Sequence, residues 1–134
     1  MKEPEIIKRY RNPVYRGDVS GFFQEYSDMP GIKVVSAFGD NSLCGDTLRI
    51  AVSISDSCSG TIEEACYEGY GCSLCIASAE VLLESLKGKS VDASLAISVD
   101  ELLASLGGIV VGRPRIKCIE LPITVLKKAM CSFQ

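Results

Sequence analysis

The residues best suited to chemistry in this sequence are cysteines at predicted boundaries between secondary-structure elements. Cys44 and Asp46 flank a glycine in a turn, Cys72 follows a Gly-x-Gly sequence at the start of a helical pattern, and Cys118 precedes the last predicted helix. Free backbone N–H groups and the helix dipole stabilise a thiolate at a helix N-terminus. Three thiolates and one carboxylate are four ligands, the number that tetrahedral zinc or one iron of an iron–sulfur centre needs.

The spacing of these residues leaves two interpretations open. Cys72 follows Cys44 by 28 positions, and Cys118 follows Cys72 by 46 positions, which matches no zinc-finger pattern. Free cysteine is also among the most buried residue types. From spacing alone, the residues form either one shared site or three unrelated packed thiols.

Composition removes several classes of function. The chain has no histidine, the usual general base and a common metal ligand, and its net charge of −3 with no basic stripe argues against nucleic acid as a partner. No apolar run approaches the roughly 18 residues that span a bilayer, so no membrane association is expected. The charged N-terminus lacks a signal-peptide pattern, and seven cysteines cannot form a closed disulfide framework. We therefore expect one cytoplasmic domain, residues 1–134, with reduced thiols.

Hydrophobic periodicity predicts an α+β fold. The strand pattern is clearest over residues 47–55, where alternation predicts one packed and one solvated face. Short turns, one of them around Cys58, would join the strands into a three-stranded antiparallel meander with helices packed on one face. The expected strands cover 32–38, 47–55 and 61–68; the expected helices cover 4–11, 73–87 and 99–106, with a last helix from about Leu121 that has Pro122 in its first turn; residues 14–30 are expected to be irregular.

Four segments, in order, resemble the U-type iron–sulfur cluster assembly scaffolds: Asn12-Pro13-x4-Gly17, Cys44-Gly45-Asp46, Gly69-x-Gly71-Cys72 and Lys117-Cys118. The resemblance covers nearly the whole chain and implies the SufE/NifU-like fold. It also implies that Cys44, Asp46, Cys72 and Cys118 hold a transient 2Fe–2S cluster, or zinc in its place.

The function implied by this resemblance is that of a scaffold and not of an enzyme. Clusters would be built from iron and from persulfide sulfur delivered by a cysteine desulfurase, and then transferred to apo iron–sulfur acceptor proteins. Cys118 is the candidate persulfide acceptor, although Cys44 could serve, and Lys117 is a candidate group for lowering the thiol pKa of Cys118. A zinc-containing sulfur acceptor that works with a desulfurase is the alternative, because the same ligands suit both.

Two features depart from the family pattern. Lys117 stands where one branch has a histidine, and Gly112-Arg-Pro-Arg115 replaces the chaperone-docking stretch Leu-Pro-Pro-Val-Lys, so transfer through an Hsp70-type chaperone is not expected. Cys72-Ser-Leu-Cys75 also resembles a thiol–disulfide oxidoreductase motif, but thioredoxin-like folds need a parallel βαβ unit. We interpret Cys75 as a packed thiol and leave open a role as resolving thiol or alternate ligand.

Overall fold

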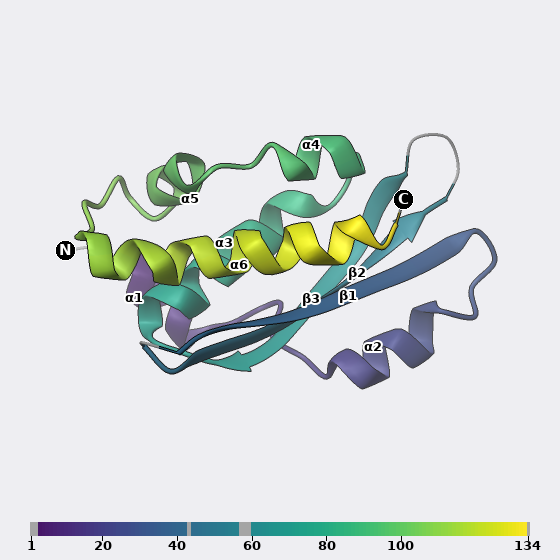
Figure 1. Cartoon of the computed structure of the whole chain (residues 1–134), viewed down its shortest axis with the longest axis horizontal. Helices are drawn as coiled ribbons and strands as arrows, with labels where there is room; N and C mark the ends of the chain where they lie inside the picture. The colour runs from purple at the N-terminus through teal and green to yellow at the C-terminus, as the bar shows by residue number, and fades with distance from the viewer. Residues whose placement is uncertain (1–2, 43, 57–59, 134) are drawn as a thin grey trace.

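The computed structural model describes residues 3–42, 44–56 and 60–133, and it confirms the predicted antiparallel meander (Figure 1). The three strands form one sheet in the order β1-β2-β3. The turn predicted around Cys58 lies outside the described residues. In chain order the elements are α1 (Glu5–Arg11), α2 (Val19–Tyr26), β1 (Ile32–Asn41), β2 (Asp46–Ser55), β3 (Thr61–Tyr70), α3 (Ser73–Leu86), α4 (Val91–Leu95), α5 (Val99–Ser105) and α6 (Arg113–Cys131).

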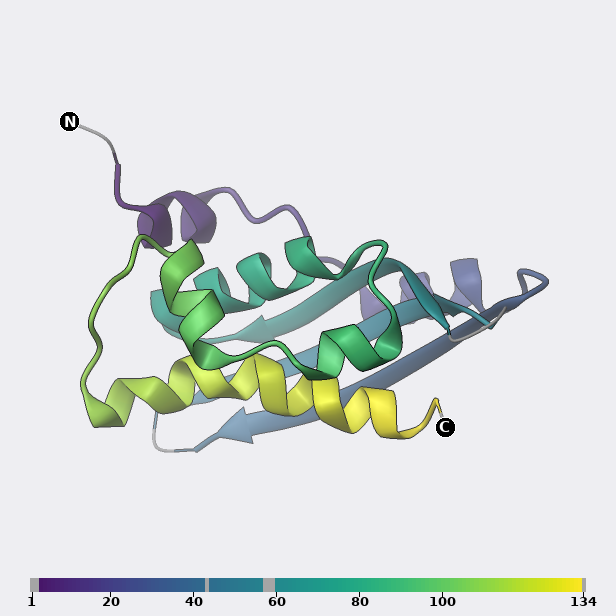
Figure 2. The same cartoon turned by 90° about the horizontal axis from the view of Figure 1, so that it is seen from above.

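The main core lies between the sheet and the two longest helices. Helices α3 and α6 run side by side across one face, with α6 over β1 and α3 nearer β3 (Figures 1 and 2). The alternating apolar residues of β2 face them and are fully buried: Leu48, Ile50, Val52 and Ile54. The period-two pattern of residues 47–55 therefore identified the packed face correctly.

The opposite face of β2 is only partly solvated, because α2 covers part of it. Ala51 and Ser53 point away from the main core and are nevertheless fully buried. The Asp18 side chain caps α2 by accepting a hydrogen bond from the Ser20 N–H, 3.1 Å away, and Val19 is buried in the first turn. The prediction that residues 14–30 are irregular was wrong, because this eight-residue helix forms where it can cover the sheet.

The expected start of the last helix was also wrong. Helix α6 begins at Arg113, with Pro114 in its first turn, so Pro122 lies inside the helix and is buried. Cys118 consequently lies within α6 and not in a loop before it. A proline lacks the N–H that would bond to the carbonyl four residues earlier, and here that carbonyl belongs to Cys118.

The approach of α6 to β1 depends on the absence of a side chain at Gly39. A Cβ atom there would lie 2.7 Å from Val125 Cγ2 and 3.4 Å from Leu121 Cδ1. We expect Gly39→Ala to lower the free energy of unfolding by about 1–3 kcal/mol, measured by chemical denaturation, because the β-branched Val125 has few alternative rotamers. Gly17→Ala is the matched control, since its Cβ would meet its nearest atom at 3.9 Å. Equal stability of the two variants would contradict this packing.

Candidate metal site

The structure brings the four predicted ligands together from three parts of the fold. Cys44 lies in the turn between β1 and β2, Asp46 is the first residue of β2, Cys72 is the N-cap of α3, and Cys118 lies in α6. The Cys44 and Cys118 sulfur atoms and an Asp46 carboxylate oxygen lie within 4.8 Å of one another. Cys72 is not part of this group, but its backbone N–H donates to Asp46 Oδ1 at 2.9 Å, which places it beside the other three. Four residues spread over positions 44 to 118 thus converge on one place, despite their long spacing in the sequence.

The four groups form an inner and an outer pair. Asp46 is 0% exposed and Cys118 is 2% exposed, whereas Cys44 and Cys72 are exposed. Solvent and other proteins can therefore reach two of the sulfur atoms, while the other two ligands line the inner wall.

The Asp46 carboxylate has one oxygen that lacks a partner. Its Oδ1 accepts a hydrogen bond from the Cys72 N–H at 2.9 Å, but its buried Oδ2 has no hydrogen-bond partner among the described residues. A buried charged oxygen is costly unless it is paired or coordinates a metal. Three sulfur ligands and one oxygen suit zinc or iron, so the residues present fit the predicted metal or cluster.

Two glycines before Cys72 allow this close approach. A Cβ atom on Gly71 would lie 2.8 Å from Asp46 Oδ1 and 3.2 Å from the Cβ of Cys75. A Cβ on Gly69 would lie 2.1 Å from the Thr47 carbonyl oxygen. The glycines therefore bring β3 and the start of α3 against β2, which holds the Asp46 carboxylate beside Cys72.

The ionisation of Cys118 differs from the expectation based on Lys117. Burial raises the pKa of the Cys118 thiol, and the neighbouring Cys72, Asp46 and Cys44 add to the rise. Lys117 is exposed on α6 and lines a shallow pocket with Asp40 and Glu120, so its charge does not outweigh these effects. Burial thus moves the pKa of Cys118 upward, and the activating role of Lys117 stays a prediction.

Cys75 adds a further thiol at the inner wall. It is 0% exposed, and burial raises its pKa to about 12, with the charges of Asp46, Cys72 and Cys44 contributing. The sequence signal was its position three residues after Cys72, which we had interpreted mainly as packing.

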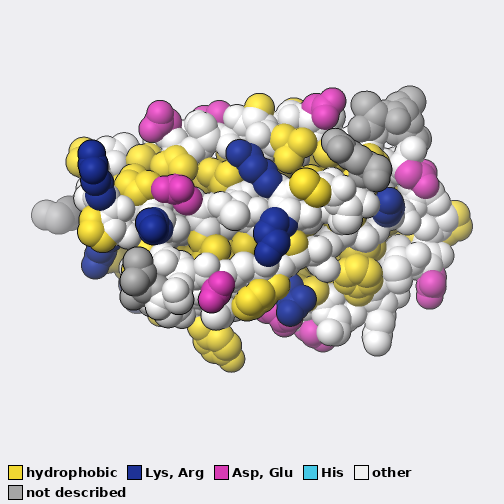
Figure 3. Space-filling model, viewed as in Figure 1, with side chains coloured by type: hydrophobic (Ala, Val, Ile, Leu, Met, Phe, Trp, Pro, Cys, Tyr) yellow, Lys and Arg dark blue, Asp and Glu magenta, His cyan; other side chains and the backbone are white. Residues whose placement is uncertain are grey.

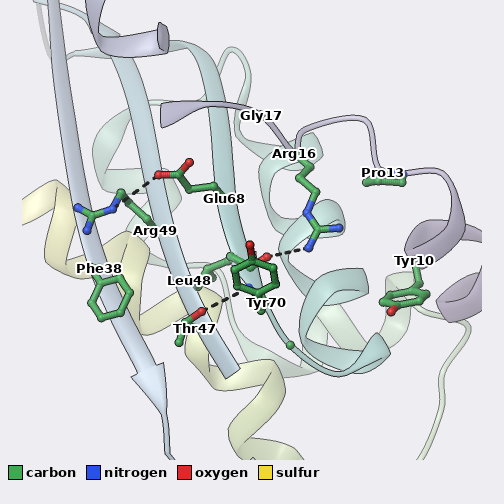
Figure 4. Close-up of a pocket in the computed structure, with 12 residues that line it drawn as sticks. Tyr10, Pro13, Arg16, Gly17, Phe38, Thr47, Leu48, Arg49, Glu68 and Tyr70 are labelled. Carbon is green, nitrogen blue, oxygen red and sulfur yellow. Dashed lines mark hydrogen bonds and ion pairs between the residues drawn. The ribbon is translucent and has the colours of Figure 1, made fainter. Parts of the chain in front are cut away.

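A groove of about 930 Å³ opens beside the site on the outer face of the sheet (Figure 4). Its lining runs from Thr47, next to Asp46, to Gly71, next to Cys72. Tyr70 is 78% exposed there, and the Arg16 guanidinium donates to the Gly69 carbonyl at 2.7 Å. The site thus has one open side.

The surface shows no concentration of charge on the face in Figure 3, where Lys and Arg side chains are interspersed with acidic, uncharged and hydrophobic ones. Among the described residues, no helix is both long and apolar enough to cross a membrane.

The comparison with family models decides where the chain belongs. The model described as the NifU-like N terminal domain matches residues 1–134. The chain is a member of this family.

Among curated relatives of this NifU-like domain is the iron–sulfur cluster assembly scaffold protein IscU of Escherichia coli (strain K12), which is 29% identical over 97% of this chain and 91% of its own length. Scaffold protein IscU 1 of Archaeoglobus fulgidus is 25% identical over 99% of this chain and 76% of its own length. The nitrogen fixation protein NifU of Nostoc sp. is 28% identical over 78% of this chain, but the match spans only 33% of that longer protein.

Solved structures confirm the fold of the NifU-like domain. One is described as a scaffold protein for the SUF system (FiSufU) from Fervidobacterium islandicum AW-1, with a TM-score of 0.68, 18% identity and coverage of 96% of both chains. Another is the N-terminal part of a nitrogen-fixing NifU-like protein from Brucella abortus, with a TM-score of 0.65, 15% identity and coverage of 96% of this chain and 91% of the other.

The inner and outer pairs predict different reactivities toward iodoacetamide in the native, metal-free protein. Exposed Cys44 and Cys72 should be alkylated early near neutral pH, together with exposed Cys131. Cys75 and Cys118 should react more slowly by a factor of about ten or more. Both are buried, and their raised pKa values leave little thiolate until the pH is much higher. Peptide mass mapping measures each rate, and protein unfolded in guanidinium is the control. Native alkylation of Cys118 as fast as that of Cys131 would contradict the burial.

We expect Pro122 to control how readily Cys118 becomes exposed to solvent. Pro122→Ala restores an N–H that can bond to the Cys118 carbonyl, which should raise the free energy of unfolding by about 1–3 kcal/mol. Native alkylation of Cys118 should slow at the same time, because the turn that carries it opens less often. Ala129→Pro, which places a buried proline in a distant turn of the same helix, should destabilise the protein. Unchanged alkylation of Cys118 in Pro122→Ala would show that Pro122 does not control its exposure.

Proposed function

We propose that this protein is a scaffold on which 2Fe–2S clusters are assembled and from which they pass to apo iron–sulfur proteins; it is not an enzyme. The observation that carries the proposal is the convergence of Cys44, Asp46 and Cys118 within 4.8 Å, where the buried Asp46 Oδ2 has no hydrogen-bond partner in the described part of the chain. The relatives named as scaffold proteins, aligned over nearly the whole chain, support it.

Ligand chemistry explains how such a site would both hold and release a cluster. The thiolates of Cys44, Cys72 and Cys118 would bind iron firmly, whereas Asp46 offers a hard oxygen ligand that exchanges more readily. The buried Asp46 is fixed by the N–H of Cys72, so the exchangeable ligand is held in place before iron arrives. The cluster is cargo of this site and not a permanent cofactor.

Sulfur would enter as a persulfide delivered by a cysteine desulfurase. An acceptor thiolate attacks the terminal sulfur of the donor persulfide, a new S–S bond forms on the acceptor, and the donor cysteine leaves as a thiolate. Cys118 remains the candidate acceptor from the family resemblance, but it is 2% exposed. Sulfur would therefore arrive first at exposed Cys44 or Cys72 and move by the same exchange to Cys118, or Cys118 would become accessible when its turn of α6 opens.

The role proposed for Lys117 belongs to the loaded site. In the resting protein the Cys118 thiol has a raised pKa and carries no charge near neutral pH. A persulfide is more acidic than a thiol, and bound thiolates carry negative charge, so the exposed Lys117 ammonium one residue away would offset charge that develops at Cys118.

Anaerobic reconstitution with ferric iron and inorganic sulfide tests the proposal. The wild-type protein should gain visible absorption of a 2Fe–2S cluster, with two iron and two sulfide per cluster, and should pass it to an apo-ferredoxin. Cys118→Ser should lose most of this absorption because an inner ligand is missing.

Cys131→Ser is the matched control, since Cys131 is an exposed cysteine at the far end of the same helix. It should assemble clusters as the wild type does. Stable binding of zinc with no cluster under any of these conditions would overturn the proposal in favour of a zinc-containing sulfur acceptor.

A further inference from the structure

Cluster assembly from persulfide leaves a redox requirement that the four ligands do not meet. The transferred sulfur is at the oxidation level of elemental sulfur, and cluster sulfide is two electrons more reduced. A pair of thiols can supply two electrons by becoming a disulfide. The site offers such a pair in Cys72, one of the four proposed ligands, and Cys75, which is not one of them.

The start of α3 places Cys72 and Cys75 within one helical turn of each other. Cys72 is the N-cap, its carbonyl accepts from the Ile76 N–H at 3.1 Å, and the helix begins at Ser73. Cys75 is therefore the third helical residue, and its Cβ would lie only 3.2 Å from a Cβ built on Gly71, the residue before Cys72. The spacing suits a disulfide, whose Cα atoms are typically about 4.4–6.8 Å apart.

The two thiols differ in their exposure to solvent. The thiol that receives sulfur must be exposed, whereas the resolving thiol must be reached only from within the site. Cys72 is exposed and makes no side-chain capping hydrogen bond, so external sulfur donors can reach it. Cys75 is 0% exposed, and a Cβ built on Gly71 would lie close to both the Cβ of Cys75 and the Asp46 carboxylate. Only a group already attached within the site can react with Cys75.

We propose that Cys75 is the resolving thiol of the site: it attacks a persulfide on Cys72, releases hydrosulfide for cluster assembly and leaves a Cys72–Cys75 disulfide. The inference rests on the proposed scaffold function. The Cys75 sulfur forms the new bond to the Cys72 sulfur, the bond to the terminal sulfur breaks, and the leaving group departs as hydrosulfide with its electron pair. The Cys75 proton is released to solvent or to the hydrosulfide, so Cys72 persulfide and Cys75 thiol yield one disulfide and one hydrogen sulfide.

The pair must then be reduced before Cys72 can bind iron. An external dithiol protein can attack the exposed Cys72 sulfur, form a mixed disulfide and resolve it with its second thiol, which returns two electrons to the pair. Persulfide that first reaches Cys118 can join this route by transfer to Cys72, because both residues adjoin the Asp46 carboxylate.

A single-turnover experiment tests the proposal. Reduced, metal-free protein without external reductant is mixed anaerobically with glutathione persulfide, and trapped sulfide and cysteine peptides are quantified by mass spectrometry. Wild-type protein should release sulfide in step with formation of a disulfide between Cys72 and Cys75. Cys75→Ser and Cys75→Ala should retain the added sulfur as protein persulfide. They should release sulfide more slowly by a factor of about ten or more, because an external thiol must replace the adjacent one.

Cys131→Ser should behave as the wild type, and Cys72→Ser, in which no disulfide to Cys75 can form, gives the sulfide made by glutathione alone. Sulfide release from both Cys75 variants at the wild-type rate would overturn the proposal. So would release from the wild type without the 72–75 disulfide, an observation that does not depend on whether the variants fold.

Reconstitution with iron and inorganic sulfide separates this inference from the scaffold function, because it bypasses persulfide reduction. The Cys75 variants should assemble clusters there as the wild type does. Failure of the wild type to assemble clusters would overturn the scaffold function, whereas failure confined to sulfide release would overturn only the role of Cys75.

Discussion

The hydrogen bond from the Cys72 N–H to Asp46 Oδ1 joins the start of β2 to the start of α3, and the rest of the site is arranged around it. The register that pairs Thr47 with Tyr70 places these two segments side by side, and Gly71 leaves room for the carboxylate between them. One bond therefore orients the Asp46 carboxylate and fixes the N-cap that carries Cys72. It also sets where the first turn of α3 directs Cys75.

The third side of the site depends on packing between layers. Cys118 reaches Asp46 because α6 lies across β1, and this approach needs the empty space at Gly39. The sheet alone would hold Asp46 but would not close the inner wall. Two of the proposed ligands are therefore buried by tertiary packing and two stay exposed on local turns, which would separate the part that holds a metal from the part that receives sulfur or iron.

Local sequence signals predicted those elements that local physics controls. Alternation over residues 47–55 identified the buried face of β2, and Gly88, with φ +86°, marks the end of α3 as expected. Periodicity could not choose between Pro114 and Pro122 as the first-turn proline of α6, because packing on the sheet decided it. For the same reason it missed α2, which forms where the sheet needs cover. The ligand set followed from the family resemblance and not from spacing, and the raised pKa of Cys118 follows from burial that no sequence pattern records.

Within the described ranges of the chain, one buried polar atom without a partner and one missing helical bond lie where a cargo would bind. Asp46 Oδ2 is buried without a hydrogen-bond partner among the described residues, and the Cys118 carbonyl cannot receive the usual helical bond because Pro122 has no N–H. Each feature costs stability in the empty protein, and a metal bound to Asp46 and Cys118 would offset the first and restrain the second. A site built in this way would gain stability on loading, while its exchangeable carboxylate and weakened helical turn would keep a route open for release. The missing bonds would therefore favour occupation of the site, and the exchangeable carboxylate would keep that occupation temporary.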